Sequence, residues 1–199
     1  MEKEAKSNSE RDKHGRILES ARRLLVQRGF QDVALDDIAR KARVAKGTLF
    51  LYYRNKDGLI SAAFTELVTR LGEDLDAVLD SPLSGRALLE QAVRVILRHF
   101  ERNRDFMARF GAGYFPGCKS RSGERLLGCM AANLGRLAAI LRRCAADGLV
   151  KGKDLEAAAS FLFGMCRSVA IHARLKPGAG TLTASLPRVV DMFLNGAGR

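Results

Sequence analysis

The stretch ALDDIARKARVAKGTLFLYYRNK, residues 34–56, is predicted to form two short helices joined by a tight turn. Its first half places four apolar side chains at the i, i+3, i+4, i+7 spacing of a helix with one buried face: Leu35, Ile38, Ala39 and Ala42. Its second half starts at residues 45–48 and continues through Leu49 and Phe50. Because residues 41–44 leave so little chain between the helices, they must cross steeply, in helix-turn-helix geometry.

Basic side chains gather on this stretch. In a helix-turn-helix, the second helix protrudes far enough to enter the major groove of DNA. A solvated helix face explains any one of these side chains taken alone, but their clustering on a helix-turn-helix favours DNA binding. The basic residues are Arg40, Lys41, Arg43, Lys46, Arg54 and Lys56.

The stretch and its flanks resemble the DNA-binding domain of TetR-type transcriptional repressors. The resemblance covers the first quarter to third of the chain. It implies an all-α fold, with an N-terminal three-helix helix-turn-helix head and a larger C-terminal helical body for ligand binding and dimerisation. The residues that carry it are Ile17–Ala21, Gly29-Phe30, Asp37–Ala39, Lys46–Leu49 and Tyr52-Tyr53-x-x-Lys56-x-x-Leu59.

Lys46 and Thr48 are expected on the first turn of the second helix, the part that meets base edges. A lysine can donate to guanine O6 or N7, and a threonine methyl can touch the thymine methyl group. Gly47 lets the backbone approach DNA closely, whereas Tyr52 and Lys56 are expected to contact phosphates. The full expected DNA-binding set is Arg43, Ala45, Lys46, Gly47, Thr48, Tyr52 and Lys56.

The head departs from the family pattern at four positions. Ala34 and Ala45 stand where the family usually has a Ser or Thr that caps a helix and contacts a phosphate. Arg43 replaces the usual turn glycine, and Phe50 replaces a tyrosine whose hydroxyl reaches a phosphate. Either charge and backbone amides supply the affinity for DNA, which we favour, or binding to an operator is weak.

The chain has 199 residues and a formal net charge of +12. Residues 1–56 hold 14 Lys and Arg against 8 Asp and Glu, a net of +6, and the other residues hold 20 against 14, also +6. Positive charge is therefore densest around the helix-turn-helix. An excess of this size favours a polyanionic partner such as nucleic acid or an anionic membrane, although a merely soluble basic protein would also show it.

Three parts are expected along the chain: a disordered arm at residues 1–11, the DNA-binding head at 12–58, and the regulatory and dimerisation body at 59–199. In the head, a helix should run from near Asp12 to Arg28 and end at Gly29, with Phe30 packing under the helix pair. No stretch alternates with strand periodicity. The body helices are expected at 57–79, 86–102, 105–114, 124–147, 155–175 and 182–194.

The body should hold an apolar ligand pocket and a dimer interface. The last two helices have wide apolar faces rich in small residues, and the resemblance implies that they pair with a second copy. Core packing remains the alternative for each apolar residue. Sulfur and aromatic side chains suit a flat or flexible apolar ligand. The expected pocket residues are Phe100, Met107, Phe110, Tyr114, Met130, Leu134, Phe161 and Met165.

No catalytic motif, metal-ligand spacing or cofactor loop occurs in the sequence, so we expect no enzyme activity, metal or cofactor. The four cysteines, Cys118, Cys129, Cys144 and Cys166, form no C-x-x-C pair and are expected to be reduced thiols, mostly buried. A redox or metal sensor is the minority interpretation.

The N-terminus lacks the apolar core of a signal peptide, and no apolar run is long enough to span a membrane, so a cytoplasmic protein is expected.

Two functions therefore remain in view. The first is a homodimeric repressor that binds double-stranded DNA at a palindromic operator and is released by an apolar small molecule. The second is an architectural protein that binds DNA by charge, with little sequence preference. Only base readout survives competition by unrelated DNA at moderate salt, so that competition separates the two.

Overall fold

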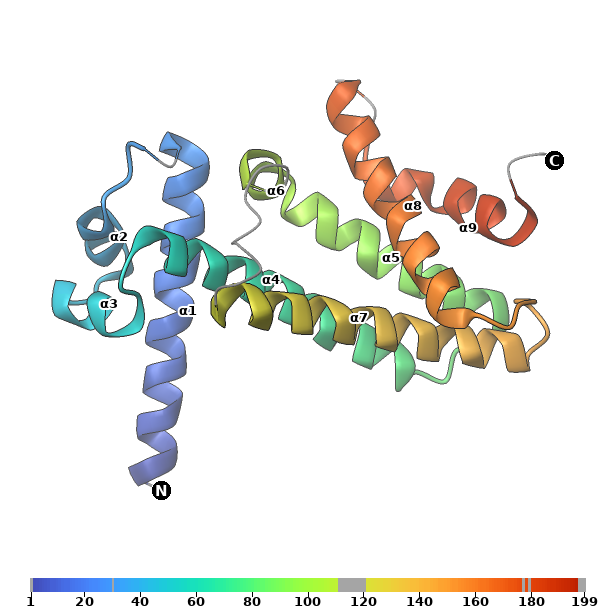
Figure 1. Ribbon diagram of the computed structural model, residues 1–199, viewed down its shortest axis with the longest axis horizontal. Helices are drawn as coiled ribbons and strands as arrows, with labels where there is room; N and C mark the ends of the chain where they lie inside the picture. The colour runs from blue at the N-terminus through green and yellow to red at the C-terminus, as the bar shows by residue number, and fades with distance from the viewer. Residues whose placement is uncertain (1, 30, 111–120, 177, 179, 197–199) are drawn as a thin grey trace. The chain divides into compact units, whose positions relative to one another are not determined.

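The computed structural model describes residues 2–29, 31–110, 121–176, 178 and 180–196, and across these ranges the regular structure is helical, as predicted (Figure 1). The chain divides into two compact units, residues 1–67 with 105–127 and residues 68–104 with 128–199. The elements are α1 Glu2–Arg28, α2 Leu35–Ala42, α3 Lys46–Tyr52, α4 Lys56–Leu79, α5 Gly85–Arg102, α6 Arg104–Phe110, α7 Arg121–Ala146, α8 Leu155–Leu175, the 3-10 turn η1 Leu182–Ser185 and α9 Leu186–Asn195.

The first unit is built on α1. This helix buries Ile17, Ala21 and Leu25 completely, and α2 packs against it. Their repeat at four-residue steps keeps these side chains on one helix face. The helix ends as expected at Gly29, whose φ is 87° and whose N–H donates to the Leu25 carbonyl at 2.9 Å. Only glycine adopts this left-handed conformation at no steric cost, so the sequence signal was reliable. Phe30, expected under the helix pair, lies outside the described residues.

The start of α1 differs from the expectation. The helix begins at Glu2, within the segment expected to be a disordered arm at residues 1–11. Residues 2–6 include Glu, Lys and Ala, which have high helix propensity and continue the helix without needing an apolar face. The first residues of the chain are therefore helical although they have no apolar side chains that could pack against a core.

An asparagine cap starts α4, the long helix that follows the head. The Asn55 side-chain oxygen accepts the Gly58 N–H at 2.8 Å, and its carbonyl accepts the Leu59 N–H at 3.2 Å. These bonds satisfy N–H groups that the first turn leaves unpaired. Further along α4, the ring of Phe64 lies 4.8 Å from that of Phe106 on α6. This packing places α6 in the first unit, whereas the sequence analysis assigned all residues after 58 to the body.

The second unit has a continuous apolar core. Helix α5 buries one whole face, including Leu89, Val93 and Ile96, and packs against α8, η1 and α9. The core continues through Leu141 of α7 and Leu162 of α8, both fully buried. The 3-10 turn η1 separates the last helix, expected as one piece from residue 182, into two elements.

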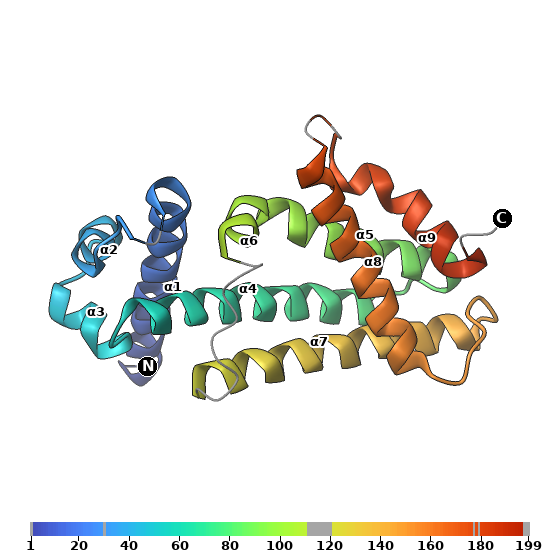
Figure 2. The same cartoon turned by 45° about the horizontal axis from the view of Figure 1, so that its top comes forward.

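Polar contacts fix α7 to the second half of α4, and the two run side by side (Figures 1 and 2). Arg136 pairs with Asp76 at 2.7 Å, and the Asn133 amide donates to the Val68 carbonyl at 2.7 Å. A Cβ at Gly72 would lie 2.7 Å from the Asn133 side-chain oxygen, so glycine is needed for this close approach. Near the end of α4, the Arg143 guanidinium binds carbonyl oxygens that the helix and its following turn leave exposed.

A buried histidine lies in the second unit. His99 of α5 is 7% exposed, and burial lowers its pKa from 6.5 to about 4, more than the Asp74 carboxylate raises it. The imidazole is therefore neutral at physiological pH. In the unfolded chain the same side chain gains a proton near pH 6.5, so acid favours unfolding between the two pKa values.

We predict that the stability of the protein falls by about 3 kcal/mol as the pH drops from about 6.5 to about 4 on account of His99, since each pKa unit corresponds to 1.36 kcal/mol. Urea unfolding across this range, with His99→Gln beside the wild type, measures the effect. The variant should lose less stability than the wild type over the same range. An equal loss in both proteins would contradict the assignment.

Candidate nucleic-acid interface

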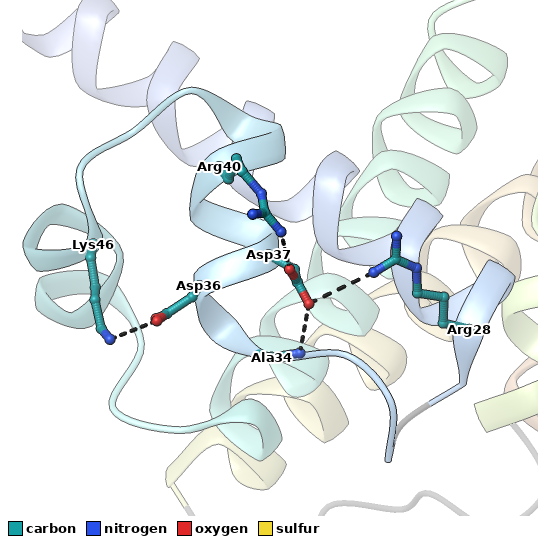
Figure 3. Close-up of polar contacts among 6 residues, drawn as sticks. All are labelled: Arg28, Ala34, Asp36, Asp37, Arg40 and Lys46. Atoms are coloured by element: carbon teal, nitrogen blue, oxygen red, sulfur yellow. Dashed lines mark hydrogen bonds and ion pairs between the residues drawn. The ribbon is translucent and has the colours of Figure 1, made fainter.

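Helix α2 lacks a side-chain cap at its N-cap residue, Ala34, as the sequence analysis expected. Its N-terminus is held instead by Asp37, whose carboxylate accepts the Ala34 N–H at 3.4 Å (Figure 3). The same carboxylate pairs with Arg40 and lies 3.8 Å from Arg28 of α1. Asp37 thus links the start of α2 to the end of α1. The next residue, Ile38, is fully buried.

The turn after α2 is closed by a residue in a strained conformation. The Val44 N–H donates to the Ala39 carbonyl at 3.0 Å and the Arg43 N–H donates to the Arg40 carbonyl at 3.2 Å, the two bonds of a Schellman motif. This motif needs a left-handed residue, and Arg43 supplies it with φ 55° and ψ 48°. Arg43 is the one non-glycine residue with positive φ in the described chain. The departure from the usual turn glycine therefore has an energetic cost, about 1–2 kcal/mol for an L-residue.

Helix α3 presents most of its surface to solvent. Only Leu49 is buried, and it anchors the helix to the head. Phe50 is 41% exposed and Leu51 is 87% exposed. The Lys46 ammonium lies 5.9 Å from the centre of the Phe50 ring, a cation–π contact within the helix. An exposed helix with apolar and cationic side chains can meet a groove that offers both phosphates and base edges.

Lys46 also forms an ion pair that sequence reasoning missed. Its ammonium lies 2.7 Å from the Asp36 carboxylate on the first turn of α2 (Figure 3). Both side chains remain more than half exposed. The sequence pattern predicted Lys46 as a DNA contact but did not pair it with Asp36. The opposite charges on the first turns of both helices were visible in the sequence, but only the angle of the turn brings them together.

The remaining predicted DNA contacts lie on accessible parts of the head. Thr48 is half-buried, and Ala45, Gly47 and Tyr52 are exposed. Lys56 begins α4, one residue before the expected start at residue 57. The structure therefore leaves the whole predicted set accessible along α3 and its two flanking turns.

Three rings, those of His14, Tyr52 and Tyr53, form an aromatic cluster at the C-terminal end of α3. Tyr53 is 6% exposed, so its side chain packs inward, and its burial raises the pKa of its hydroxyl. The ring of His14 on α1 lies 5.8 Å from the Tyr53 ring and 6.0 Å from the Tyr52 ring. These contacts tie the C-terminal end of α3 to the first helix.

Residues 17–63 match the family described as bacterial regulatory proteins, tetR family. The match includes all of α2, all of α3 and the start of α4. The head of this chain is a TetR-family DNA-binding domain. This match supports a DNA-binding transcriptional regulator of the TetR type.

Individual TetR-family relatives agree with this assignment. The fatty acid metabolism regulator protein of Bacillus subtilis is 27% identical over 90 residues, which are 45% of this chain and 45% of that protein. FadR from Bacillus subtilis in complex with stearoyl-CoA has a similar fold, with a TM-score of 0.75, 19% identity, and coverage of 91% of this chain and 97% of that chain. FadR from Thermus thermophilus in complex with lauroyl-CoA gives a TM-score of 0.63, 22% identity, and coverage of 92% and 94%. The chain spans less than half the length of the fatty acid metabolism regulator and of the Bacillus subtilis regulators YhgD and YvkB, which it also matches.

The expected ligand-pocket residues of this TetR-family chain are divided between the two units. Met107 and Phe110 lie on α6 of the first unit, and Tyr114 lies outside the described residues. The second unit contains the other five. Phe100 is buried, with its ring 5.7 Å from Phe163, whereas Met130 and Leu134 are half-buried on α7.

The last two of these residues, Phe161 and Met165, line an open groove of about 760 Å³ along α8, η1 and α9. Phe161 is 71% exposed, so in the single chain it is not enclosed as a pocket residue would be. Apolar periodicity predicted the side chains correctly as one helix face, but it does not tell an inward face from an outward one.

The described cysteines agree with the expectation in part. Cys144 and Cys166 are buried, and burial raises the pKa of both thiols, that of Cys166 to about 12. Such thiols react slowly, because the thiolate is the reactive form. Cys129 is half-buried, and Cys118 lies outside the described residues. Within the described ranges, no group of three or more His, Cys, Asp or Glu side chains could hold a metal ion, and no helix could cross a membrane.

We predict that Arg43→Gly makes the protein more stable than Arg43→Ala by about 1 kcal/mol, because both remove the same charge but only glycine relieves the left-handed strain. Urea unfolding of both variants gives the difference. Both should bind DNA more weakly than the wild type, to a similar extent, because each loses one cation. Equal stability of the two variants would show that the turn carries no strain.

Proposed function

We propose that the protein is a cytoplasmic homodimeric repressor. In this proposal, two heads bind the half-sites of a palindromic operator, and an apolar small molecule bound in the body releases the DNA. The observation that carries the DNA-binding part is the exposed first turn of α3, with Lys46 and Thr48 on a helix anchored by Leu49. The residues proposed to contact DNA are Arg43, Ala45, Lys46, Gly47, Thr48, Tyr52 and Lys56.

The proposed roles follow from side-chain chemistry. Lys46 would donate to guanine acceptors and Thr48 would place its methyl group against thymine. Arg43 and Lys56 flank α3 in the sequence and would pair with phosphates, as would the Tyr52 hydroxyl. Since Ala34 and Ala45 provide no hydroxyl, cations and backbone N–H groups must supply most of the phosphate contacts.

A dimer is supported by an exposed seam on α8. Three apolar residues, Phe161, Met165 and Leu175, lie with Ser168 and His172 at the alternating four- and three-residue steps of a coiled-coil seam, and each is exposed or half-buried in the single chain. Phe161 and Leu175, at its two ends, are 71% and 76% exposed. Met192 of α9, 42% exposed, lines the same groove as Phe161. Large apolar side chains this exposed mark an association surface, and a second copy, packing its own α8 and α9 against them, would bury both sets.

The proposed effector is an amphipathic apolar molecule of the fatty acyl-CoA class. Two proteins with a similar fold are described in complexes with stearoyl-CoA and lauroyl-CoA, and a sequence relative is a fatty acid metabolism regulator. The residues that the sequence pattern assigns to a pocket, Phe100, Met107, Phe110, Tyr114, Met130 and Leu134, have aromatic, sulfur and aliphatic side chains whose chemistry suits an acyl chain. With Phe161 and Met165 assigned to the dimer groove, these six remain the proposed pocket residues.

We predict that the wild-type protein binds DNA from its own promoter at near-physiological salt and resists an excess of unrelated DNA. Lys46→Ala should weaken this binding about tenfold or more, since a good base contact contributes about 1–3 kcal/mol. Thr48→Ala should also weaken it, with a smaller effect. Fluorescence anisotropy with labelled promoter DNA and unlabelled competitor measures all three proteins.

The alternative, a charge-driven architectural protein, is favoured by the missing hydroxyls at Ala34 and Ala45. It predicts binding that falls steeply with salt, is equal on any DNA and ignores Thr48→Ala. That pattern would replace the repressor proposal. If base readout is found, adding stearoyl-CoA or lauroyl-CoA to the complex tests the effector, with free CoA as the control for the headgroup. Release by the acyl-CoA alone supports an apolar pocket, whereas no release, or equal release by free CoA, contradicts it.

We predict that Phe161→Glu converts the protein from a dimer to a monomer at micromolar concentration. The substitution places a charge at the exposed end of the α8 seam, where it would be desolvated in a dimer. Because Phe161 is 71% exposed in the single chain, folding should be nearly unaffected. Sedimentation equilibrium gives the mass, and circular dichroism checks the helix content.

The matched control is Arg167→Glu, which adds negative charge at an exposed position of α8 away from the seam. It should leave the dimer intact although it changes the charge by more. A monomer in both variants would indicate a general charge effect. A dimer in both would place the interface elsewhere.

A further inference from the structure

The ion pair between Asp36 and Lys46 joins the first turns of the two helices that form the reading motif. Its atoms, the Asp36 carboxylate oxygen and the Lys46 nitrogen, are 2.7 Å apart (Figure 3). The residues are ten positions apart in the sequence, so the pair exists only when the turn is formed. In the DNA-free protein the lysine ammonium therefore points toward Asp36.

Asp36 differs in this respect from its neighbour. Asp37 binds the Ala34 N–H, Arg40 and Arg28, all on α2 or before it, and so serves the structure of the head. Asp36 points to the other side of α2, where its carboxylate accepts a hydrogen bond from Lys46 of α3 (Figure 3). Asp37 therefore stabilises the fold of the head, whereas Asp36 contacts the lysine that is proposed to read DNA.

The position of Asp36 matters for an approaching polyanion. A carboxylate within hydrogen-bond distance of Lys46 lies on the surface that Lys46 presents to DNA. It repels phosphates, and it occupies a donor that a phosphate would otherwise use. Both side chains are more than half exposed, so the pair is of the weak, exchangeable kind that DNA can displace.

We infer that Asp36 is a specificity-determining residue, which holds Lys46 and lowers the affinity of the head for DNA that offers it only phosphates. On unrelated DNA, Lys46 would leave the Asp36 carboxylate to bind a phosphate, and Asp36 would then face the DNA backbone without a partner. On the operator, Lys46 would also leave Asp36, but its hydrogen bonds to base acceptors would compensate for the lost ion pair. The inference rests on the proposed function, in which Lys46 reads base edges.

The test is Asp36→Asn, with binding to unrelated duplex DNA measured by fluorescence anisotropy between 50 and 200 mM salt. Affinity for this DNA should rise about tenfold or more near 0.1 M salt, and the slope of log K against log salt should steepen by about 0.9 for each head bound to the DNA, the value for one added phosphate contact. Asp36→Glu, which keeps a carboxylate, should stay near the wild type. Asp32→Asn removes an exposed carboxylate before α2 and controls for net charge.

The same substitution in a Lys46→Gln background decides whether the effect acts through the lysine. There, Asp36→Asn should raise affinity no more than Asp32→Asn does. An undiminished rise in that background, or equal effects of Asp36→Asn and Asp32→Asn in the wild-type background, would overturn the inference. Failure of the proposed function looks different, because the wild type would then bind promoter and unrelated DNA equally.

Discussion

The head of this protein depends on the three-residue connection between α2 and α3. It can be this short because Arg43 takes a left-handed conformation and closes a Schellman motif, at the expense of backbone strain. The connection starts α3 at Lys46 and lets Leu49 reach the core that α1 and α2 build. Everything proposed for DNA binding follows from that geometry. A longer or looser turn would leave the same cations on the surface but without a common orientation.

The turn also explains why charge alone is a poor guide to this surface. The chain carries +12, yet Lys46, the lysine proposed to read bases, pairs with Asp36, and Arg40 pairs with Asp37. Pairing of this kind reduces the number of cations that are free to bind the phosphates of any DNA. Discrimination between DNA sequences then depends on how side chains meet the base edges. A strongly basic protein can thus still be selective.

Much of the head could be predicted from sequence, because its signals are local. The apolar spacing of α2 and the glycine that ends α1 were both predicted correctly. The Asp36–Lys46 pair was not, since it joins two helices and depends on the angle between them. The start of α1 was missed for another reason: a polar, charged segment with high helix propensity resembles a disordered arm when only apolar anchors are counted.

The body shows where periodicity stops being informative. The α8 face through Phe161 and Met165 was recognised as one apolar stripe and assigned to a ligand pocket, while the structure leaves it in an open groove. A stripe that packs inside one chain and a stripe that packs between two chains have the same pattern. Only exposure in the folded monomer separates them, and exposure depends on long-range packing.

The central claim is that the first turn of α3 reads base edges in the major groove. Methylation interference at guanine N7 on the promoter fragment tests it most directly, because the added methyl group blocks the acceptor that Lys46 would use. The account predicts two clusters of interfering guanines, related by two-fold symmetry and separated by whole helical turns. Binding that tolerates methylation at every guanine would contradict it.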